Sequence, residues 1–176
     1  KEFNVQIHKQ TGNGYGNSLI EAINICSTEF FCIFNADGSF KNTEISKMKK
    51  ILDKENLDFV FGSRYQGNSG SKDDTALTLI GNYIFTKIGQ IFFNLPITDI
   101  LYTFVLGRTS KAKKLKLNQK SFSFCVELPI KVKQNKMLMK SCSSYEYKRI
   151  AGKKKVNEFR DGYNILMFMI RYFFQT

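Results

Sequence analysis

Short apolar runs alternate along the chain with segments whose apolar residues recur at helical spacing. The run Phe30–Phe34 is apolar at every position, which is typical of a strand buried on both faces of a parallel sheet. Thr43–Lys54 carries its apolar residues at helical spacing, and Phe59–Phe61 is a second apolar run, within a strand predicted over 57–61. This alternation predicts an α/β domain with a mostly parallel central sheet flanked by helices.

The same patterns predict the remaining elements. Phe3, Val5 and Ile7 alternate like a strand, and Ser18 with Glu21 forms a capping-box pattern that predicts a helix ending near Cys26. Further on we expect a helix over 75–93, a strand over 103–106, a surface helix and turn over 111–120, a helix over 122–133 that Pro129 would kink or start later, a strand over 137–145, and an apolar helix over 163–174 that Asp161 would cap.

Composition limits the class of protein. The 176 residues fit a single domain over 1–176, and a hydrophobic content of 43% can supply a core. Lys and Arg outnumber Asp and Glu by 27 to 15, giving a formal charge of +12. Such a balance favours an anionic partner, whether a nucleotide phosphate, a nucleic acid or an anionic membrane face.

Cysteine, histidine and hydropathy exclude several classes of site. The four cysteines show no metal-ligand spacing and fit a reduced, cytoplasmic core, and the single histidine, His8, is best explained as structural. No apolar stretch reaches the length of a membrane-spanning helix. Tyr83–Phe93 and Tyr163–Phe174 could lie either in the core or against a membrane, so we expect a cytoplasmic protein that can contact the cytoplasmic face of a membrane.

Two charged residues follow two of the predicted strands. Asp37 follows the strand over 30–34, and Arg64 follows the strand over 57–61. Because ligands bind beyond the carboxyl ends of parallel strands, we expect these side chains at one site, with the polar segment 62–74 as a mobile loop over it. A carboxylate suits Mg²⁺ or Mn²⁺, and a guanidinium suits phosphate.

A glycine-rich segment, Lys9–Gly16, precedes the first predicted helix. Backbone N–H groups near Lys9 and Gly14 could meet phosphate at the helix N-terminus. The spacing imitates a dinucleotide-binding fingerprint, but the third glycine comes one position early, which disfavours a nicotinamide or flavin enzyme. Taken one at a time, Asp37, Arg64 and the basic run 149–155 also have ordinary structural explanations, namely a strand-end turn, a surface ion pair and a solvated run.

Six motifs in a fixed order strengthen the functional interpretation. They are Gly14-Tyr15-Gly16-Asn17-Ser18-Leu19, Asn35-Ala36-Asp37-Gly38, Gly62-Ser63-Arg64-Tyr65, Thr98-Asp99 before a strand, Glu127 in the next helix, and Arg149-Ile150-Ala151-Gly152 with Lys155. In this order the chain resembles the family 2 inverting glycosyltransferases of the GT-A (Rossmann-like) fold, and especially the dolichol- and polyprenyl-phosphate mannose synthase branch. The resemblance covers nearly the whole chain.

The resemblance implies a role for each motif. Asp37, with Asn35, would hold Mg²⁺ or Mn²⁺; Arg64 would bind phosphate; and Arg149 with Lys155 would bind the diphosphate of a GDP- or UDP-sugar donor. Asp99 would lie near the acceptor and is the nearest candidate base for a hydroxyl. Two positions depart from the family: Asn35 replaces the first aspartate of the D-x-D motif, and Lys154 stands where the family has serine.

The resemblance also implies a substrate and an extent. The expected acceptor is a lipid phosphate, polyprenyl or dolichyl phosphate, glycosylated with inversion; a carbohydrate hydroxyl in surface polysaccharide synthesis is the alternative. The family's first strand and its base-binding loop normally precede a segment like 3–8, so we expect a fragment of about the C-terminal two-thirds of the domain, inactive alone. A degenerate member remains open, whereas a nucleic-acid-binding domain is disfavoured because the aromatic residues lie in apolar runs.

Overall fold

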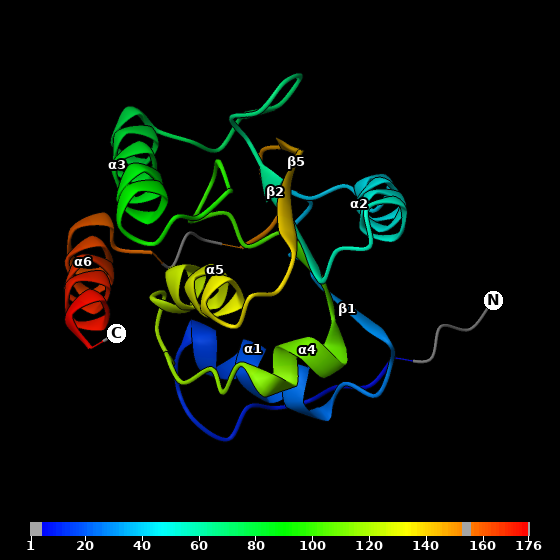
Figure 1. The fold of residues 1–176 in the computed structure, drawn as a ribbon. Coiled ribbons are helices and arrows are strands. Elements are labelled where there is room, and N and C mark those ends of the chain that lie inside the picture. Colours follow the sequence, from blue (N-terminus) through cyan, green and yellow to red (C-terminus); the bar gives the residue numbers. More distant parts are fainter. Residues whose placement is uncertain (1–4, 153–155, 176) are drawn as a thin grey trace.

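The computed structural model describes residues 5–152 and 156–175 (Figure 1). Helices and strands follow one another along the chain in this order: α1 Tyr15–Ile25, β1 Phe30–Ile33, α2 Thr43–Lys54, β2 Phe59–Ser63, β3 Gly70–Ser71, α3 Ala76–Phe92, β4 Val105–Arg108, α4 Thr109–Lys114, α5 Phe124–Gln134, β5 Met139–Ser143, β6 Tyr145–Glu146 and α6 Glu158–Phe174.

The central sheet has four strands in the order β1-β4-β2-β5. Strand β4 is antiparallel to both β1 and β2, whereas β2 and β5 are parallel. It follows that β1, β2 and β5 point the same way and only β4 is reversed, which confirms the mostly parallel sheet. Their three carboxyl ends therefore meet at one edge, together with the chain that enters β4.

Helices cover both faces of this sheet. On one face α2 packs through Met48 and Leu52 against alternate strand residues such as Val60 and Leu106. The other face packs against α1, α4, α5 and α6, with Phe59 and Phe61 in that core. Because successive strand residues point to opposite faces, a strand covered on both sides is apolar throughout. The expectation that β1 is such a strand within a parallel sheet is wrong in part: β1 lies at the edge beside antiparallel β4, with Phe31 and Ile33 buried and Phe30 and Cys32 only half-buried, whereas β2 is buried at every position.

Several predicted elements are confirmed and others are wrong. Helix α2 has the predicted bounds, and β1, β2, α3 and β5 lie within two or three residues of prediction. The strand expected over 3–7 is wrong for its described part, because Val5 and Ile7 are exposed and belong to no strand; Phe3 lies outside the described residues. The helix predicted from Ser18 begins at Tyr15, and the Ser18 hydroxyl donates to the Tyr15 carbonyl instead of capping.

The boundaries of the later helices differ for local reasons. Helix α4 ends at Lys114, and the segment after it is not helical because buried Glu127 accepts the N–H groups of Asn118 and Gln119. Pro129 lies inside α5, which begins at Phe124. Helix α6 begins earlier than predicted, with Asn157 as its N-cap; Asp161 accepts the Asn157 N–H from within the first turn.

The polar segment 62–74 contains a short strand. β3 pairs in parallel with β6, which fastens this loop to the chain that follows β5. Whether the loop moves stays a prediction.

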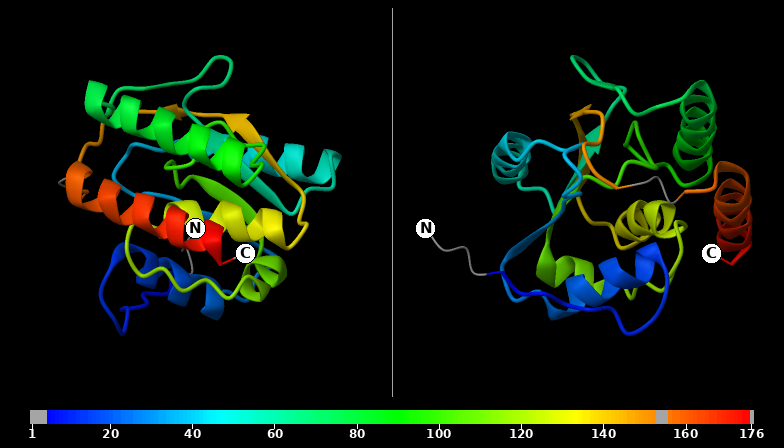
Figure 2. Two further views of the ribbon diagram at one scale, coloured as in Figure 1. Left: turned by 60° about the vertical axis from the view of Figure 1, so that its left-hand side comes forward. Right: turned by 180° about the vertical axis from the view of Figure 1, so that it is seen from behind.

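Helices α3 and α6 lie side by side along one flank of the molecule (Figure 2). The ring of Phe173 meets those of Phe92 and Phe93 at centroid distances of 5.4 and 6.0 Å. Within the described chain, no helix combines the length and apolar content needed to cross a membrane.

Candidate active site

A cavity of about 750 Å³ opens at the edge of the sheet where the three parallel strands end. β1 leads into Asn35 and Asp37, β2 into Arg64, and β5 through β6 into Glu146 and Arg149, all of which line the cavity. The N-terminus of α1, one side of α3 and residues 101–103 complete the wall. The topology therefore brings together most of the side chains that the sequence singled out.

Asp37 is fixed on one side and open on the other. Its Oδ1 accepts hydrogen bonds from the Ser39 hydroxyl at 2.6 Å and the Ser39 N–H at 3.0 Å, and its Oδ2 lies 3.9 Å from Arg149 Nη1. Partial burial alone would raise the pKa of Asp37, but the hydrogen bonds from Ser39 and the charge of Arg149 outweigh it, so the pKa lies below its ordinary value. Asp37 is therefore a carboxylate at neutral pH.

Residues 147–150 lie against the Asp37 loop. The Tyr147 N–H donates to the Ser39 carbonyl at 2.9 Å, and the Ile150 N–H donates to the Asp37 carbonyl at 2.8 Å. Gly38 has φ of +85°, and a Cβ there would lie 2.7 Å from Ile150 Cγ1, so glycine is required both by the backbone and by this contact.

Arg149 joins this loop to the β3 loop. Its Nη2 donates to Asp73 Oδ2 at 2.6 Å, and its Nε donates to the same oxygen at 3.3 Å. The hydrogen bonds to Asp73, and after them the charges of Asp73 and Asp37, raise the pKa of Arg149 above its usual value despite partial burial. The guanidinium is thus held at the cavity wall with Nη1 toward Asp37.

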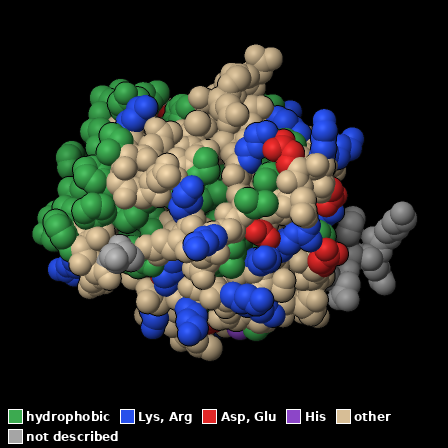
Figure 3. Space-filling view, viewed as in Figure 1, with side chains coloured by type: hydrophobic (Ala, Val, Ile, Leu, Met, Phe, Trp, Pro, Cys, Tyr) green, Lys and Arg blue, Asp and Glu red, His purple; other side chains and the backbone are tan. Residues whose placement is uncertain are grey.

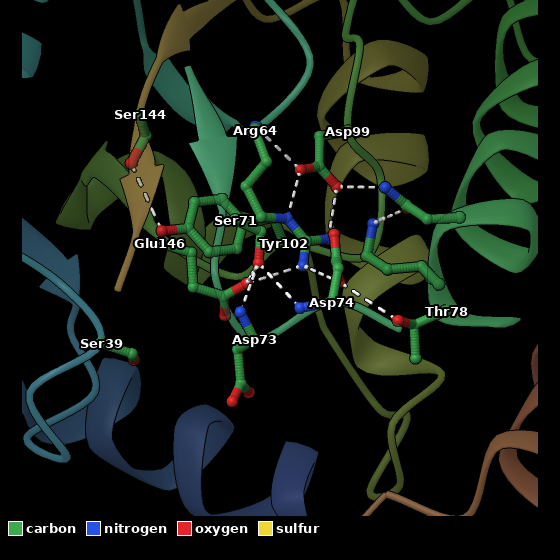
Figure 4. Close-up of polar contacts among 12 residues, drawn as sticks. Ser39, Arg64, Ser71, Asp73, Asp74, Thr78, Asp99, Tyr102, Ser144 and Glu146 are labelled. Atoms are coloured by element: carbon green, nitrogen blue, oxygen red, sulfur yellow. Dashed lines mark hydrogen bonds and ion pairs between the residues drawn. The ribbon is translucent and has the colours of Figure 1, made fainter. Parts of the chain in front are cut away.

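Arg64 lies at the centre of four charged side chains, called here the Arg64 cluster: Arg64, Asp74, Asp99 and Glu146 (Figure 4). Its Nε and Nη2 donate to Asp99 at 2.8 and 3.1 Å, and its Nη1 donates to both Asp74 and Glu146 at 3.0 Å. The guanidinium also lies over the Tyr102 ring, 4.7 Å from its centroid. Burial would lower the pKa of Arg64, but the charge and hydrogen bonds of Asp99 raise it well above the ordinary value.

Asp99 lies beneath Arg64, away from the cavity. Its side chain is 0% exposed, and besides Arg64 it accepts a hydrogen bond from Asn82 Nδ2 at 2.7 Å. The structure therefore joins the two predicted residues Arg64 and Asp99, but it places only Arg64 in the cavity wall.

The N-terminus of α1 is partly covered by the chain that precedes α5. Gly14 lines the cavity, but the Asn17 N–H donates to the Lys120 carbonyl at 3.1 Å, so this donor is already satisfied. Lys9 is exposed and does not line the cavity, and Lys155 lies outside the described residues. The phosphate-binding roles of these residues stay predictions.

Glu127 does not line the cavity and has a structural role. It is fully buried, forms an ion pair with Lys131 at 2.7 Å and accepts the N–H groups of residues 118 and 119. This buried pair holds the segment that crosses α1.

Sequence reasoning missed Asp73, Asp74 and Glu146, which all line the cavity. The aspartates lie in a polar loop that gave no periodic signal, and Glu146 follows a strand predicted to end at 145. The position of Glu146 directly after a parallel strand was the one available signal, because such positions face the ligand crevice.

The donor set at Asp37 fits a divalent cation of the Mg²⁺ or Mn²⁺ type. No group of three or more His, Cys, Asp or Glu residues suited to a metal occurs among residues 5–152 and 156–175. However, Mg²⁺ commonly takes one or two protein oxygens and completes its shell with phosphate and water, and Asp37 and Asn35 both face the cavity.

The fold and the site define an α/β protein with a carboxylate and arginines at the ligand edge of its sheet, and the comparisons give the family. The family model described as Glycosyl transferase family 2 matches residues 1–116, so the chain belongs to that family. No curated protein matches the chain.

Solved structures confirm the GT-A type of fold. Glucosyl-3-phosphoglycerate synthase from Mycobacterium tuberculosis in complex with UDP is similar with a TM-score of 0.65 and 10% identity, over 92% of this chain and 56% of that chain. Another structure of that enzyme gives 0.56 and 12% over 94% and 57%, and its complex with Mn²⁺ and UDP-glucose gives 0.55 and 10% over 96% and 56%. The chain thus spans little more than half the length of these proteins.

Proposed function

We propose that this chain carries the metal- and acceptor-binding part of a glycosyltransferase that moves a sugar, with inversion, from a nucleotide sugar to an acceptor held at a membrane. The observation that carries the proposal is the meeting of Asp37, Arg64 and Arg149 in one cavity of a family 2 domain.

On the donor side, Asp37 and Asn35 would hold Mg²⁺ or Mn²⁺, and Arg149 would meet the diphosphate of a UDP- or GDP-sugar. The complex of the similar synthase with Mn²⁺ and UDP-glucose favours a UDP-sugar. A divalent cation there would neutralise the departing diphosphate. Arg149 is already oriented by Asp73, so it would bind the diphosphate without losing much side-chain freedom.

The membrane proposal rests on an apolar surface formed by α3 and α6 (Figure 3). Large apolar side chains at least 42% exposed make it up: Leu77, Leu79, Ile80, Tyr83, Ile84, Ile91, Phe92, Phe159, Tyr163, Ile170, Phe173 and Phe174. Twelve of the nineteen exposed large apolar residues within the described segments therefore lie on two adjacent helices. Clustering of this extent is typical of an interaction surface.

Basic residues next to this surface favour an anionic bilayer over a protein partner. Exposed basic residues lie on the two helices themselves, Lys87 on α3 and Arg160 and Arg171 on α6. Apolar side chains beside basic ones match the acyl and headgroup layers of an anionic membrane.

Vesicle binding tests this surface. We expect the protein to co-sediment with vesicles of phosphatidylcholine and phosphatidylglycerol more than with phosphatidylcholine alone, and Ile91→Ser to weaken that binding. Leu138→Ser, which removes a side chain that is 54% exposed outside α3 and α6, is the matched control and should bind like the wild type. Equal loss in both variants, or self-association in place of vesicle binding, contradicts the membrane proposal.

Two kinds of membrane-held acceptor are compatible with the apolar surface of α3 and α6. Polyprenyl phosphate is the acceptor that the resemblance implies, and it needs no base. A carbohydrate hydroxyl is favoured by the carboxylates that surround Arg64, since a hydroxyl needs a proton acceptor.

Transfer assays on the protein at its full natural length test the function. UDP- and GDP-sugars are offered with Mn²⁺ to polyprenyl phosphate and to lipid-linked saccharides. We expect transfer that is lost in Asp37→Ala, whereas Asp53→Ala, a change in an exposed i,i+4 ion pair of α2, should leave it unchanged. If the wild type neither binds the donor nor transfers the sugar, the proposal is contradicted.

A further inference from the structure

The Arg64 cluster distinguishes the two candidate acceptors. Resting on the proposed function, we propose that the acceptor group is a carbohydrate hydroxyl and that Glu146 is the catalytic residue that takes its proton.

Arg64 has little hydrogen-bonding capacity left for a phosphate. A guanidinium has five N–H donors. Four of them are used here: Nε and one on Nη2 by Asp99, and the two on Nη1 by Asp74 and Glu146. A phosphate could bind in the usual two-pronged manner only by displacing a carboxylate from a nearly buried ion pair.

The charge of the cavity wall also disfavours a phosphate acceptor. Among its described residues, four carboxylates (Asp37, Asp73, Asp74 and Glu146) face two guanidinium groups, those of Arg64 and Arg149. Asp99 adds a further negative charge behind Arg64. The proposed cation would offset the charge near Asp37, but the Arg64 cluster has three carboxylates to one guanidinium, and a phosphate acceptor beside it would be repelled by this excess, whereas a neutral hydroxyl would not.

Only some of these carboxylates have an oxygen free to accept a proton. Asp99 is 0% exposed and both its oxygens accept hydrogen bonds. Asp74 lines the cavity, but both its oxygens also accept hydrogen bonds, Oδ1 from Arg64 and Oδ2 from the Tyr65 hydroxyl. We therefore assign these two residues to positioning Arg64 and Tyr65.

Glu146 differs in having one fixed and one open oxygen. Its Oε2 accepts from Arg64 Nη1 at 3.0 Å and from the Ser71 hydroxyl at 2.7 Å, whereas Oε1 accepts no hydrogen bond from another residue in the described parts of the chain. The side chain lines the cavity and is 11% exposed. A general base needs this combination of a fixed carboxylate and an accessible lone pair.

Asp73 is the rival base because it also lines the cavity. Its Oδ2 is held by Arg149, on the donor side, and it lies on a loop, whereas Glu146 lies in β6, which is paired with β3. The geometry therefore assigns Asp73 to positioning Arg149.

The step balances without a further reactant. The acceptor oxygen forms a bond to the anomeric carbon of the nucleotide sugar while the bond from that carbon to the diphosphate oxygen breaks. The diphosphate leaves with the electron pair, and the hydroxyl proton passes to Glu146 Oε1.

The test compares acceptors in Glu146→Gln, using the full-length protein. With a lipid-linked saccharide we expect transfer to fall by roughly 10²- to 10⁴-fold while UDP binding stays the same. Glu146→Asp should recover part of the rate. Glu44→Gln, which changes a carboxylate that holds Ser144 and Tyr145 from outside the cavity, controls for disturbance of β6 and should keep most of the activity.

Several results would overturn the inference and leave the proposed function standing. The first is that the wild type transfers sugar to polyprenyl phosphate and to no saccharide. The second is that Glu146→Gln keeps the wild-type transfer rate. The third is that Asp73→Asn loses more of the transfer rate than Glu146→Gln does, without losing UDP binding. If Glu146→Gln does not fold, Ser71→Ala, which removes one hydrogen bond to Oε2, should lower the rate with the saccharide while UDP binding stays the same; an unchanged rate overturns the inference. Absence of donor binding in the wild type overturns the proposed function as well.

Discussion

The backbone N–H of Ile150 donates to the Asp37 carbonyl at 2.8 Å, and the Ile150 side chain lies over Gly38. Two segments more than a hundred residues apart are thereby fixed to each other at the cavity. The same contact fixes the place of Arg149, because it precedes Ile150 in the chain.

This contact makes Gly38 more sensitive to substitution than Gly67, another glycine with positive φ. Gly38→Ala would suffer both the cost of φ near +85° and the approach to Ile150, whereas Gly67, with φ of +61°, has nothing within 4 Å of a Cβ. We expect Gly67→Ala to lower the free energy of unfolding by roughly 1–2 kcal/mol and Gly38→Ala to lower it further. Urea unfolding checks this, and equal losses would contradict the contact.

The Arg64 cluster predicts a large stability effect. Arg64→Met leaves three carboxylates together, with Asp99 fully buried and the other two nearly so. Breaking a buried ion pair from one side costs about 3–5 kcal/mol, so we expect a loss of that size in the free energy of unfolding. Lys49→Met removes a solvent-exposed pair with Asp53 and should cost about 1 kcal/mol or less. Similar losses in the free energy of unfolding for the two variants, measured by urea unfolding, would contradict this large contribution of the Arg64 cluster to stability.

Ser39 is expected to tune metal affinity without touching the metal. Its hydroxyl and N–H both donate to Asp37 Oδ1, which orients the carboxylate. If the proposed metal site is correct, Ser39→Ala should weaken Mn²⁺-dependent UDP binding by about 10- to 100-fold, as is common for groups that orient a ligand. Ser69→Ala, in the β3 loop and outside the cavity lining, should bind as the wild type does. Calorimetry of UDP binding with Mn²⁺ measures both, and an unchanged affinity in Ser39→Ala would contradict this role.

Glu21 predicts a dependence of stability on acid pH. Hydrogen bonds from the Thr11 hydroxyl, His8 and the Thr11 N–H lower the pKa of Glu21 from 4.5 to about 2. Because the folded pKa lies below the unfolded one, the stabilisation is complete above about pH 4.5 and is lost as the pH falls toward 2. Glu21→Gln should therefore flatten the pH dependence of unfolding between these values, and a carboxyl resonance of Glu21 that titrates near 4.5 would contradict the prediction.

The sequence predicted those parts of the fold in which a local pattern has one structural solution. The fully apolar run at β1 and the helical spacing of α2 each fit one element, and strand ends correctly placed Asp37 and Arg64 at one edge. The alternation of Val5 with Ile7 was too short to specify a strand without a neighbour, and nothing local indicates that β4 runs against β1 and β2.

The site was less predictable because it depends on contacts between distant segments. Ser18 and Glu21 match a capping box, yet Glu21 instead accepts hydrogen bonds from Thr11 and Asn17. Asp99 follows the family motif but lies under Arg64, and Glu146 reaches the cavity only because β6 pairs with β3. Such partners are chosen by tertiary packing, which leaves no periodic trace in the sequence.

The proposed donor site is tested most directly by calorimetric titration of UDP into the full-length protein with and without Mn²⁺, in the wild type, Asp37→Ala and Arg149→Ala. We expect Mn²⁺ to strengthen binding to the wild type, Asp37→Ala to remove this Mn²⁺ effect, and Arg149→Ala to weaken binding with or without the ion. Binding that is indifferent to Mn²⁺ and unchanged in both variants would show that the cavity at Asp37 and Arg149 is not the donor site.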